Sequence, residues 1–513
     1  MGKSKNRKIG LLVNAVSIIL QICISVFLTP FILRTIGDRD YGIYTFCLSL
    51  TSWLTTLLIA AGSGYQKYIS RETKKDKVNG EKFACGVFFK IFLFLSLIIA
   101  LFGFFVWILF FSGVIPLTAY SETEKNKVLI ILACSVLVCC VTTFLTCYKS
   151  YFFYKEAFTL IYSIDLIAIV LQAVTSVCAL ILGFGVLGFA VAHFSMSILS
   201  SFVQSILAIF VLKEKIKLKS SPEEKIKSKI LTKEIIVFSF FVLINTIIDT
   251  INSNMDKTIL GFVDPASVTI YSLGSNFNSY LSSFSSAISI VFVQKITNDY
   301  YDKNFENVKN TYVDVCFLQM LLFFLIFGGF ASCGFDFMIC WVGEERIWSF
   351  YVGVALMAIF SPVFTNTLAT NVRRLENHHK KACIIYILTA GCNVAISVLL
   401  CCLLPKSIAI WGCVIGTAIS TIAGQWIGFS IFDYRITKLP VKEFWIRFLK
   451  VLLIAMVSFA ISFCVGLIPF ISNLKPIFRL LIKGFVFLIL YCALALVFYK
   501  TFIFKYFFKR FNK

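Results

Sequence analysis

The sequence predicts an all-α integral membrane protein with 14 transmembrane helices, forming two pseudo-symmetric six-helix lobes followed by two C-terminal helices. Three observations lead to this fold class: the length of the apolar segments, the low content of charged residues, and the uneven distribution of lysine and arginine. Hydrophobic residues make up 59% of the 513 residues and charged residues only 14%, whereas a soluble domain carries roughly 25% charged residues. This composition argues against a soluble globular protein.

Fourteen segments are each long and apolar enough to cross a lipid bilayer, which requires about 20 residues. Only helices and closed β-barrels satisfy the backbone in lipid, and these segments lack the strict alternation of a barrel strand. The sequence therefore predicts helices. The predicted spans are residues 10–33, 42–62, 83–111, 128–148, 157–182, 186–212, 235–262, 266–293, 312–334, 347–371, 382–403, 407–432, 446–469 and 478–499.

The basic residues predict the orientation of these spans. With a cytoplasmic N-terminus, 36 of the 48 Lys and Arg residues fall in cytoplasmic segments and 8 in outer loops, with four inside spans. This asymmetry follows the positive-inside rule, so both termini are predicted to be cytoplasmic. The net charge of +22 is thus explained by topology and attraction to anionic lipid, and nucleic-acid binding is not expected. The basic start and long first apolar run predict an uncleaved first span.

A basic connection at residues 213–234, with eight Lys residues, separates six spans from eight. We interpret it as a cytoplasmic linker between lobes, the alternative being a loop without architectural meaning. The predicted parts are an N-terminal lobe at 1–212, the linker at 213–234, a C-terminal lobe at 235–432, and two last spans with a basic cytoplasmic tail at 433–513.

A weak internal repeat supports this division. The stretch Ile36–Tyr44 and the stretch Val263–Tyr271 are both tight acidic turns entering a helix, and an Ile-Tyr pair ends each. An even number of spans separates the two copies, so a pseudo-twofold axis along the membrane normal is predicted.

The strongest signal for a polar site lies in span seven. Asn245, Asp249, Asn252 and Asp256 are spaced by 4, 3 and 4 residues, which places them on one helical face. A carboxylate near the membrane midplane, where Asp249 is predicted, costs about 2.5–3.5 kcal/mol. The face is therefore expected either to line a translocation cavity or to form hydrogen bonds between helices.

Span one carries a second polar stripe, and span eight is rich in serine and asparagine. Asn14, Ser17 and Gln21 repeat at helical spacing in span one, and Asn276 represents the polar face of span eight. Small polar residues also allow close helix packing, which is the alternative for much of span eight. Asp165, deep in span five, is a further candidate.

Several cations lie near the ends of spans. Arg34, Lys67, Lys257 and Arg373 are candidates for binding an anionic head group, although surface and topological roles also explain such residues. The lysines within other spans are expected to extend to the membrane surface. These lysines are Lys90, Lys450 and Lys483.

Enzymatic functions find no support in the sequence. The 18 Cys residues lack metal-ligand spacing, there are three His residues, and no Walker loop or Ser–His–Asp arrangement is evident. We therefore expect no catalytic residue, cofactor or metal ion.

Three motifs carry a family resemblance. The stretches Leu28–Tyr44, Gly62–Glu72 and Asp256–Gly261 resemble the polysaccharide-export branch of the multidrug/oligosaccharidyl-lipid/polysaccharide flippase superfamily, the Wzx-type oligosaccharide or O-antigen flippases. The resemblance extends over the whole chain at the level of fourteen spans. It implies two six-helix lobes around a central cavity, with two extra helices that help to hold lipid tails.

The function that the resemblance implies is transport of a lipid-linked sugar. The implied substrate is an undecaprenyl-pyrophosphate-linked oligosaccharide, moved from the inner to the outer leaflet of the bacterial cytoplasmic membrane by alternating access, for O-antigen, lipopolysaccharide, capsule or similar biosynthesis. Membrane lipids, H+ or Na+ as a coupling ion, and polysaccharide polymerase machinery are the implied partners. The cavities of the family are typically cationic, whereas the deep groups here are mostly Asn, Gln, Ser and Asp, so the phosphate-binding residues stay open.

Other functions compete with this one. A cation-coupled multidrug antiporter of the same superfamily usually has twelve spans, although Asp249 would suit a cationic drug. A lipid II flippase differs in its substrate. A polysaccharide polymerase or ligase usually has a large outward loop, which this sequence lacks.

Overall fold

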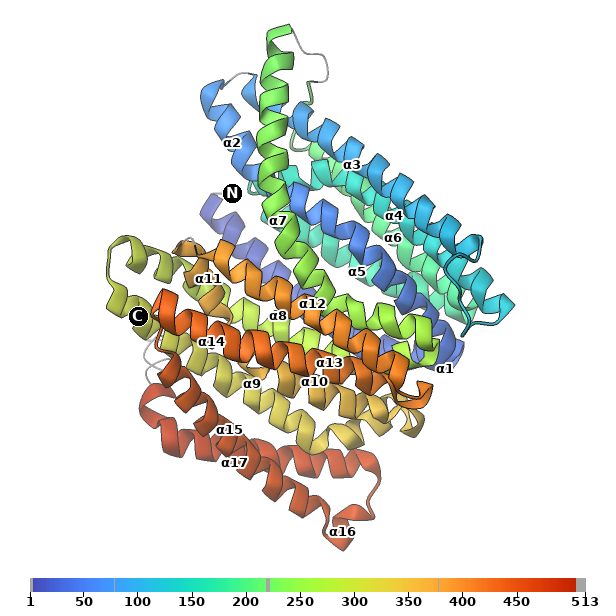
Figure 1. The fold of residues 1–513 in the computed structure, drawn as a ribbon, viewed down its shortest axis with the longest axis vertical. Helices are drawn as coiled ribbons and strands as arrows, with labels where there is room; N and C mark the ends of the chain where they lie inside the picture. Colours follow the sequence, from blue (N-terminus) through green and yellow to red (C-terminus); the bar gives the residue numbers. More distant parts are fainter. Residues whose placement is uncertain (1–2, 78, 218–221, 377, 504–513) are drawn as a thin grey trace. The chain divides into compact units, whose positions relative to one another are not determined.

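The computed structural model describes residues 3–77, 79–217, 222–376 and 378–503 (Figure 1). Every regular element in these ranges is a helix. Twelve helical segments of the described chain are long and apolar enough to span a membrane. The prediction of an all-α membrane protein is therefore confirmed.

Contacts within the chain define two compact units, Met1–Thr269 and Ile270–Lys513. The border differs in position from the predicted linker at 213–234. Helix α7 begins inside that linker, at Pro222, and packs mainly against α1. The lobe boundaries drawn from the internal repeat stay a prediction.

The N-terminal unit is built from seven helices (Figure 1). They are α1 (Lys3–Gly62), α2 (Tyr65–Lys75), α3 (Gly80–Phe111), α4 (Glu122–Tyr154), α5 (Phe158–Ile181), α6 (Gly185–Phe210) and α7 (Pro222–Val263). Helix α4 packs against α3 and α6, and α5 packs against α1 and α6. The start of α4 is fixed by a capping box, in which Ser121 and Glu124 satisfy each other's backbone N–H groups.

Helix α1 contains a sharp change of direction at Gly37. The spanning segment Leu12–Ile59 has 48 residues, and a straight helix of that length would measure about 72 Å. The hydrocarbon core is only about 30 Å thick, so the segment must turn. Gly37 has φ 79° and ψ 173°, a conformation that glycine adopts far more readily than other residues.

The exact number of spans stays a prediction. Counting the two halves of α1 separately adds one span to the twelve segments. Helix α8 (Pro265–Tyr301), with 37 residues, is not among the twelve, and counting it would give the predicted 14.

Small and polar residues bring α7 close to the second half of α1. The hydroxyl of Ser49 lies 3.0 Å from that of Thr258, and the hydroxyl of Thr56 lies 3.0 Å from that of Thr250. Just beyond α7, a Cβ atom on Gly42 would overlap the carbonyl oxygen of Pro265, the first residue of the next helix. Hydroxyl pairs and close backbone approach are the usual means of joining membrane helices, because lipid provides no hydrophobic driving force between them.

The C-terminal unit contains most of α8 and the helices that follow it. These are α9 (Phe305–Val342), α10 (Trp348–Phe364), α11 (Thr367–Leu375), α12 (His379–Leu403), α13 (Ala409–Thr421), α14 (Phe429–Phe432), α15 (Val441–Gly466), α16 (Pro469–Ser472) and α17 (Pro476–Ile503). Two π-helical stretches, Ile422–Gly428 and Asp433–Thr437, flank α14.

The last two long helices, α15 and α17, pack against α9. The carboxylate of Asp336 on α9 binds Arg479 at 2.9 Å and Lys483 at 2.8 Å, both on α17. The expectation that Lys483 extends to the membrane surface is therefore wrong. A buried carboxylate on the neighbouring helix satisfies its charge within the protein.

Candidate functional site

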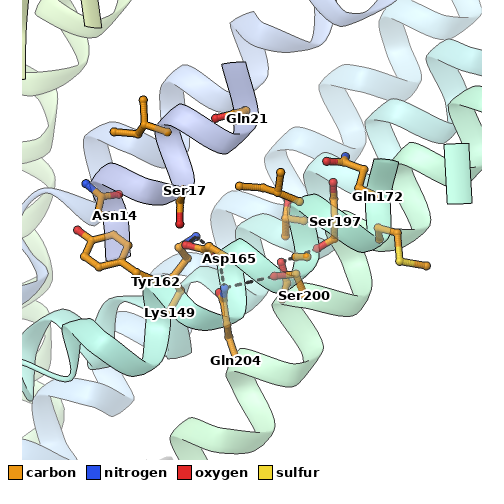
Figure 2. Close-up of a pocket in the computed structure, with 16 residues that line it drawn as sticks. Asn14, Ser17, Gln21, Lys149, Tyr162, Asp165, Gln172, Ser197, Ser200 and Gln204 are labelled. Atoms are coloured by element: carbon orange, nitrogen blue, oxygen red, sulfur yellow. Dashed lines mark hydrogen bonds and ion pairs between the residues drawn. The ribbon is translucent and has the colours of Figure 1, made fainter. Parts of the chain in front are cut away.

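A polar cavity lies within the N-terminal unit, among α1, α4, α5 and α6. Its volume is about 390 Å³. Figure 2 shows its polar side chains converging from these four helices. The lining residues are Asn14, Ser17, Ile18, Gln21, Thr142, Lys149, Tyr162, Asp165, Ala168, Ile169, Gln172, Met196, Ser197, Ser200, Ser201 and Gln204.

The charged centre of this cavity is Asp165 on α5. Its Oδ1 accepts a hydrogen bond of 2.7 Å from Nε2 of Gln204 on α6, and both carboxylate oxygens lie 3.4 Å from Nζ of Lys149 on α4. A charge-assisted N–H···O bond normally measures about 2.7–2.9 Å. Asp165 is thus held tightly by the amide and loosely by the ammonium group, and both charged side chains are partly exposed.

Helix α1 contributes one wall of the cavity. The structure places Asn14, Ser17 and Gln21, which formed the polar stripe of the first predicted span, at this site. The Ser17 hydroxyl donates to the carbonyl of Val13. The amides of Asn14 and Gln21 offer both donors and acceptors to whatever enters the cavity.

Helix α6 contributes a second polar stripe, which the sequence analysis missed. Ser197, Ser200, Ser201 and Gln204 follow helical spacing, and Gln204 Nε2 also lies 3.4 Å from the Ser200 hydroxyl. The 3- and 4-residue spacing was the signal that would have found this stripe.

Lys149 is a second cavity residue that the sequence analysis did not identify. It follows the predicted end of span four, so it was counted among the cytoplasmic basic residues. The structure places it inside α4 and at the cavity. Asp165 and Lys149 are the charged residues of the lining, so their charges cancel. The other polar groups of the cavity are amides and hydroxyls.

The polar face predicted in span seven does not line this cavity. Asp249 is exposed on α7, whereas Asp256 is buried. The side chains of Asn245 and Asn252 lie outside the described residues. A role for these four residues in translocation stays a prediction, as does that of Asn276 on α8, which is half-buried in the C-terminal unit.

The four candidate head-group cations lie in different environments. Arg34 is exposed on α1 and Lys67 is exposed on α2, where its ammonium group lies 4.5 Å from the ring centre of Phe238. Lys257 is half-buried on α7. The cavity among α1, α4, α5 and α6 includes none of these residues.

Arg373 is fully engaged within the C-terminal unit. Its Nε and Nη2 atoms donate to the two carboxylate oxygens of Asp433 at 2.8 Å and 2.7 Å, and its guanidinium lies 3.9 Å from the ring centre of Phe429. Its side chain is 5% exposed. In this conformation the charge of Arg373 is neutralised, so the group is not presented to a head group.

No cluster of three or more His, Cys, Asp or Glu side chains in the described ranges is arranged to hold a metal ion. The chemistry available in the polar cavity is therefore that of hydrogen bonding and of one loosely held ion pair. Such a site can bind a solute rich in hydroxyl groups or a cation.

A family model described as polysaccharide biosynthesis protein matches residues 8–293, more than half of the chain. No curated protein matches the chain in sequence.

Solved membrane transporters have a similar structure. The lipid II flippase MurJ in an inward-closed conformation has 15% identity and a TM-score of 0.74, over 96% of this chain and 100% of that chain. An inward-facing multidrug resistance MATE transporter of the MOP superfamily has 14% identity and a TM-score of 0.61, over 85% and 99%. A point mutant of the Vibrio cholerae MATE transporter VcmN has 13% identity and a TM-score of 0.55, over 86% of this chain and 99% of that chain. At these identities the similarity shows the fold.

Proposed function

Because the chain belongs to the polysaccharide biosynthesis protein family, within the multidrug/oligosaccharidyl-lipid/polysaccharide flippase superfamily, we propose that it moves an undecaprenyl-pyrophosphate-linked oligosaccharide across the bacterial cytoplasmic membrane. Transport runs from the inner to the outer leaflet by alternating access. The flipped unit then serves a polymerase that builds a cell-surface polysaccharide such as O-antigen or capsule.

The polar cavity of the N-terminal unit is the observation that carries this proposal. A sugar head group cannot cross hydrocarbon unless its hydroxyls find partners, because an unpaired polar group in an apolar medium costs several kcal/mol. The cavity offers amides from Asn14, Gln21 and Gln172 together with serine hydroxyls. We assign contact with sugar hydroxyls to this wall.

The pyrophosphate needs a different environment. The cavity has one ammonium group, Lys149, and that group faces Asp165. Arg34, Lys67 and Lys257 stay candidates for the phosphates.

The energy source of transport is the second part of the proposal. Asp165 is the carboxylate that lines the cavity, and it is the group to which we assign a coupling H+ or Na+ ion. A cation from solution could take the place of the Lys149 ammonium group beside Asp165. The shorter hydrogen bond between Asp165 and Gln204 would stay intact. Imposed proton and sodium gradients in proteoliposomes test this assignment separately from the substrate.

The decisive experiment follows the lipid-linked sugar by leaflet in a strain that lacks the gene. We expect the sugar to accumulate on the cytoplasmic side and to reach the outer leaflet when the gene is restored. Normal sidedness together with altered drug sensitivity would instead indicate a multidrug antiporter. Accumulation of lipid II at the inner leaflet would indicate a lipid II flippase.

A further inference from the structure

A second cavity of the N-terminal unit opens between α3 and α7, next to the end of the second half of α1. Its volume is about 420 Å³, and its wall is almost entirely apolar. Ile91, Phe94 and Leu95 line it from α3, and Ile235, Ile236 and Leu243 line it from α7. Exposed apolar side chains are ordinary in a membrane protein, so the apolar wall alone identifies no ligand.

Three polar residues, Lys90, Thr232 and Ser239, line this cavity, and two of them distinguish it from an ordinary lipid-facing surface. Lys90 is the one charged residue that lines it. The Ser239 hydroxyl, also in the lining, is buried and has no hydrogen-bond partner among the described residues. The buried Ser239 hydroxyl is costly unless an accepting group meets it, and Lys90, which is exposed, offers a positive charge in the same lining.

A polar cavity of about 380 Å³ continues along the same two helices toward the linker. Its charged lining is mixed, with four carboxylates and three cations. These are Arg71, Glu72, Lys75 and Asp76 at and just after α2, and Glu224, Lys227 and Glu234 on α7, beside Gly80 and Phe83 of α3. The groove between α3 and α7 that contains both cavities is called the seam below. Its lining is charged near the linker and becomes apolar farther along the two helices. That gradient matches an amphipathic molecule lying along the seam.

We propose that this seam binds an anionic glycerophospholipid, with an acyl chain in the apolar cavity and its phosphate at Lys90 and Ser239. The charge asymmetry of the sequence predicts that the linker end is cytoplasmic, so the lipid comes from the inner leaflet. A lipid with one net negative charge fits the single lysine of the wall better than a pyrophosphate does. The inference is independent of which glycan the protein carries.

Lys450 provides a matched control. It also lies within a predicted span and is exposed, on α15, but it lines neither of these cavities. An effect of general membrane charge would be equal for Lys90 and Lys450. A specific lipid site would be affected only by substitution of Lys90.

The test measures lipid retained by the purified full-length protein, by native mass spectrometry after extraction from equimolar phosphatidylglycerol and phosphatidylcholine. We expect wild type to retain phosphatidylglycerol preferentially. Lys90→Gln should lower that retention about fivefold, which corresponds to the roughly 1 kcal/mol that one basic residue contributes at an anionic surface. Lys90→Arg and Lys450→Gln should retain it as wild type does.

A second variant tests the apolar part without changing charge. Leu243→Trp fills the cavity and should lower phosphatidylglycerol retention although Lys90 is intact. Equal retention of the two lipids by wild type, or equal loss in Lys90→Gln and Lys450→Gln, would overturn the proposal. Displacement of phosphatidylglycerol by undecaprenyl phosphate at equimolar concentration would also overturn it and assign the seam to the transported lipid. Thermal unfolding of each variant identifies any loss that arises from misfolding.

Discussion

The two units contain acid–base pairs of opposite character. In the C-terminal unit, Arg373 and Asp433 form two short hydrogen bonds, and their side chains are 5% and 1% exposed. In the N-terminal unit, Lys149 and Asp165 lie 3.4 Å apart, are 39% and 29% exposed, and border a cavity.

The difference shows that a charge within membrane helices does not by itself indicate a transport site. A buried bidentate pair holds α11 against the segment that follows α14, since both carboxylate oxygens of Asp433 accept from the Arg373 guanidinium. A loose pair beside a cavity can exchange a partner for a solute. Exposure and distance, and not the presence of a charge, separate the two cases.

Removing one partner of the buried pair should have the largest effect. Arg373→Met leaves Asp433 as an uncompensated buried charge, which costs about 3–5 kcal/mol. The expected result is low abundance of folded protein in the membrane and a lower unfolding temperature after purification. The double variant Arg373→Met/Asp433→Leu should recover most of that stability. An unchanged unfolding temperature in the single variant would contradict a structural role of the pair.

Asp165→Asn should lower transport with little loss of stability, because a partly exposed pair contributes only about 0–1 kcal/mol. A hydrogen bond to a charged group is worth about 1.5–3 kcal/mol, so a substrate or ion contact of that strength predicts roughly a 10- to 150-fold decrease in transport. Leaflet-resolved labelling of the lipid-linked sugar measures the rate.

Asp40→Asn is the matched control for Asp165→Asn. Asp40 pairs with Lys127 at 2.8 Å in the same unit but does not line the cavity. Transport should be near normal in this variant. Equal losses in the two variants would remove Asp165 from the mechanism.

Glu214 extends the comparison to a buried acid for which the described residues provide no ion pair. It follows α6, is 6% exposed, and accepts a hydrogen bond of 3.2 Å from the Tyr65 hydroxyl. Burial raises the pKa of Glu214 from 4.5 to about 8, with Glu81 raising it further and Tyr65, Cys85 and Lys155 lowering it.

The raised pKa predicts how stability depends on pH. Between about pH 4.5 and pH 8 the folded protein retains a proton that the unfolded chain releases, so the free energy of unfolding falls as pH rises. Glu214→Gln should flatten this dependence and raise the unfolding temperature at pH 8 relative to wild type. Unfolding temperatures at pH 5, 7 and 9 measure it, and identical slopes for both proteins would refute the prediction.

Asp249→Asn should have the smallest effect of the four. Asp249 is exposed on α7 and lies outside the polar cavity. Because span seven is predicted to contribute to translocation, we expect a small decrease in transport at constant membrane abundance. Activity equal to wild type would exclude Asp249 from the mechanism.

Some of the site was accessible from the sequence. Asn14 and Gln21 repeat along one face of one helix, and that periodicity survives folding because it is a property of the helix itself. The partners of Asp165 could not be predicted from the sequence, since Lys149 and Gln204 lie 16 and 39 residues away in the chain. Arg373 was predicted as a candidate for binding an anionic head group, and its pairing with Asp433 was not foreseen because the two residues are 60 positions apart in the chain.

By itself, the sequence determined the membrane environment and the fold class of this protein. Hydropathy and loop charge are local properties, and each segment partitions between lipid and water according to its own values. The tertiary structure alone decided which buried charges are neutralised and which face a cavity. Those outcomes depend on how each helix is rotated about its axis against its neighbours, and a rotation leaves the composition of every segment unchanged.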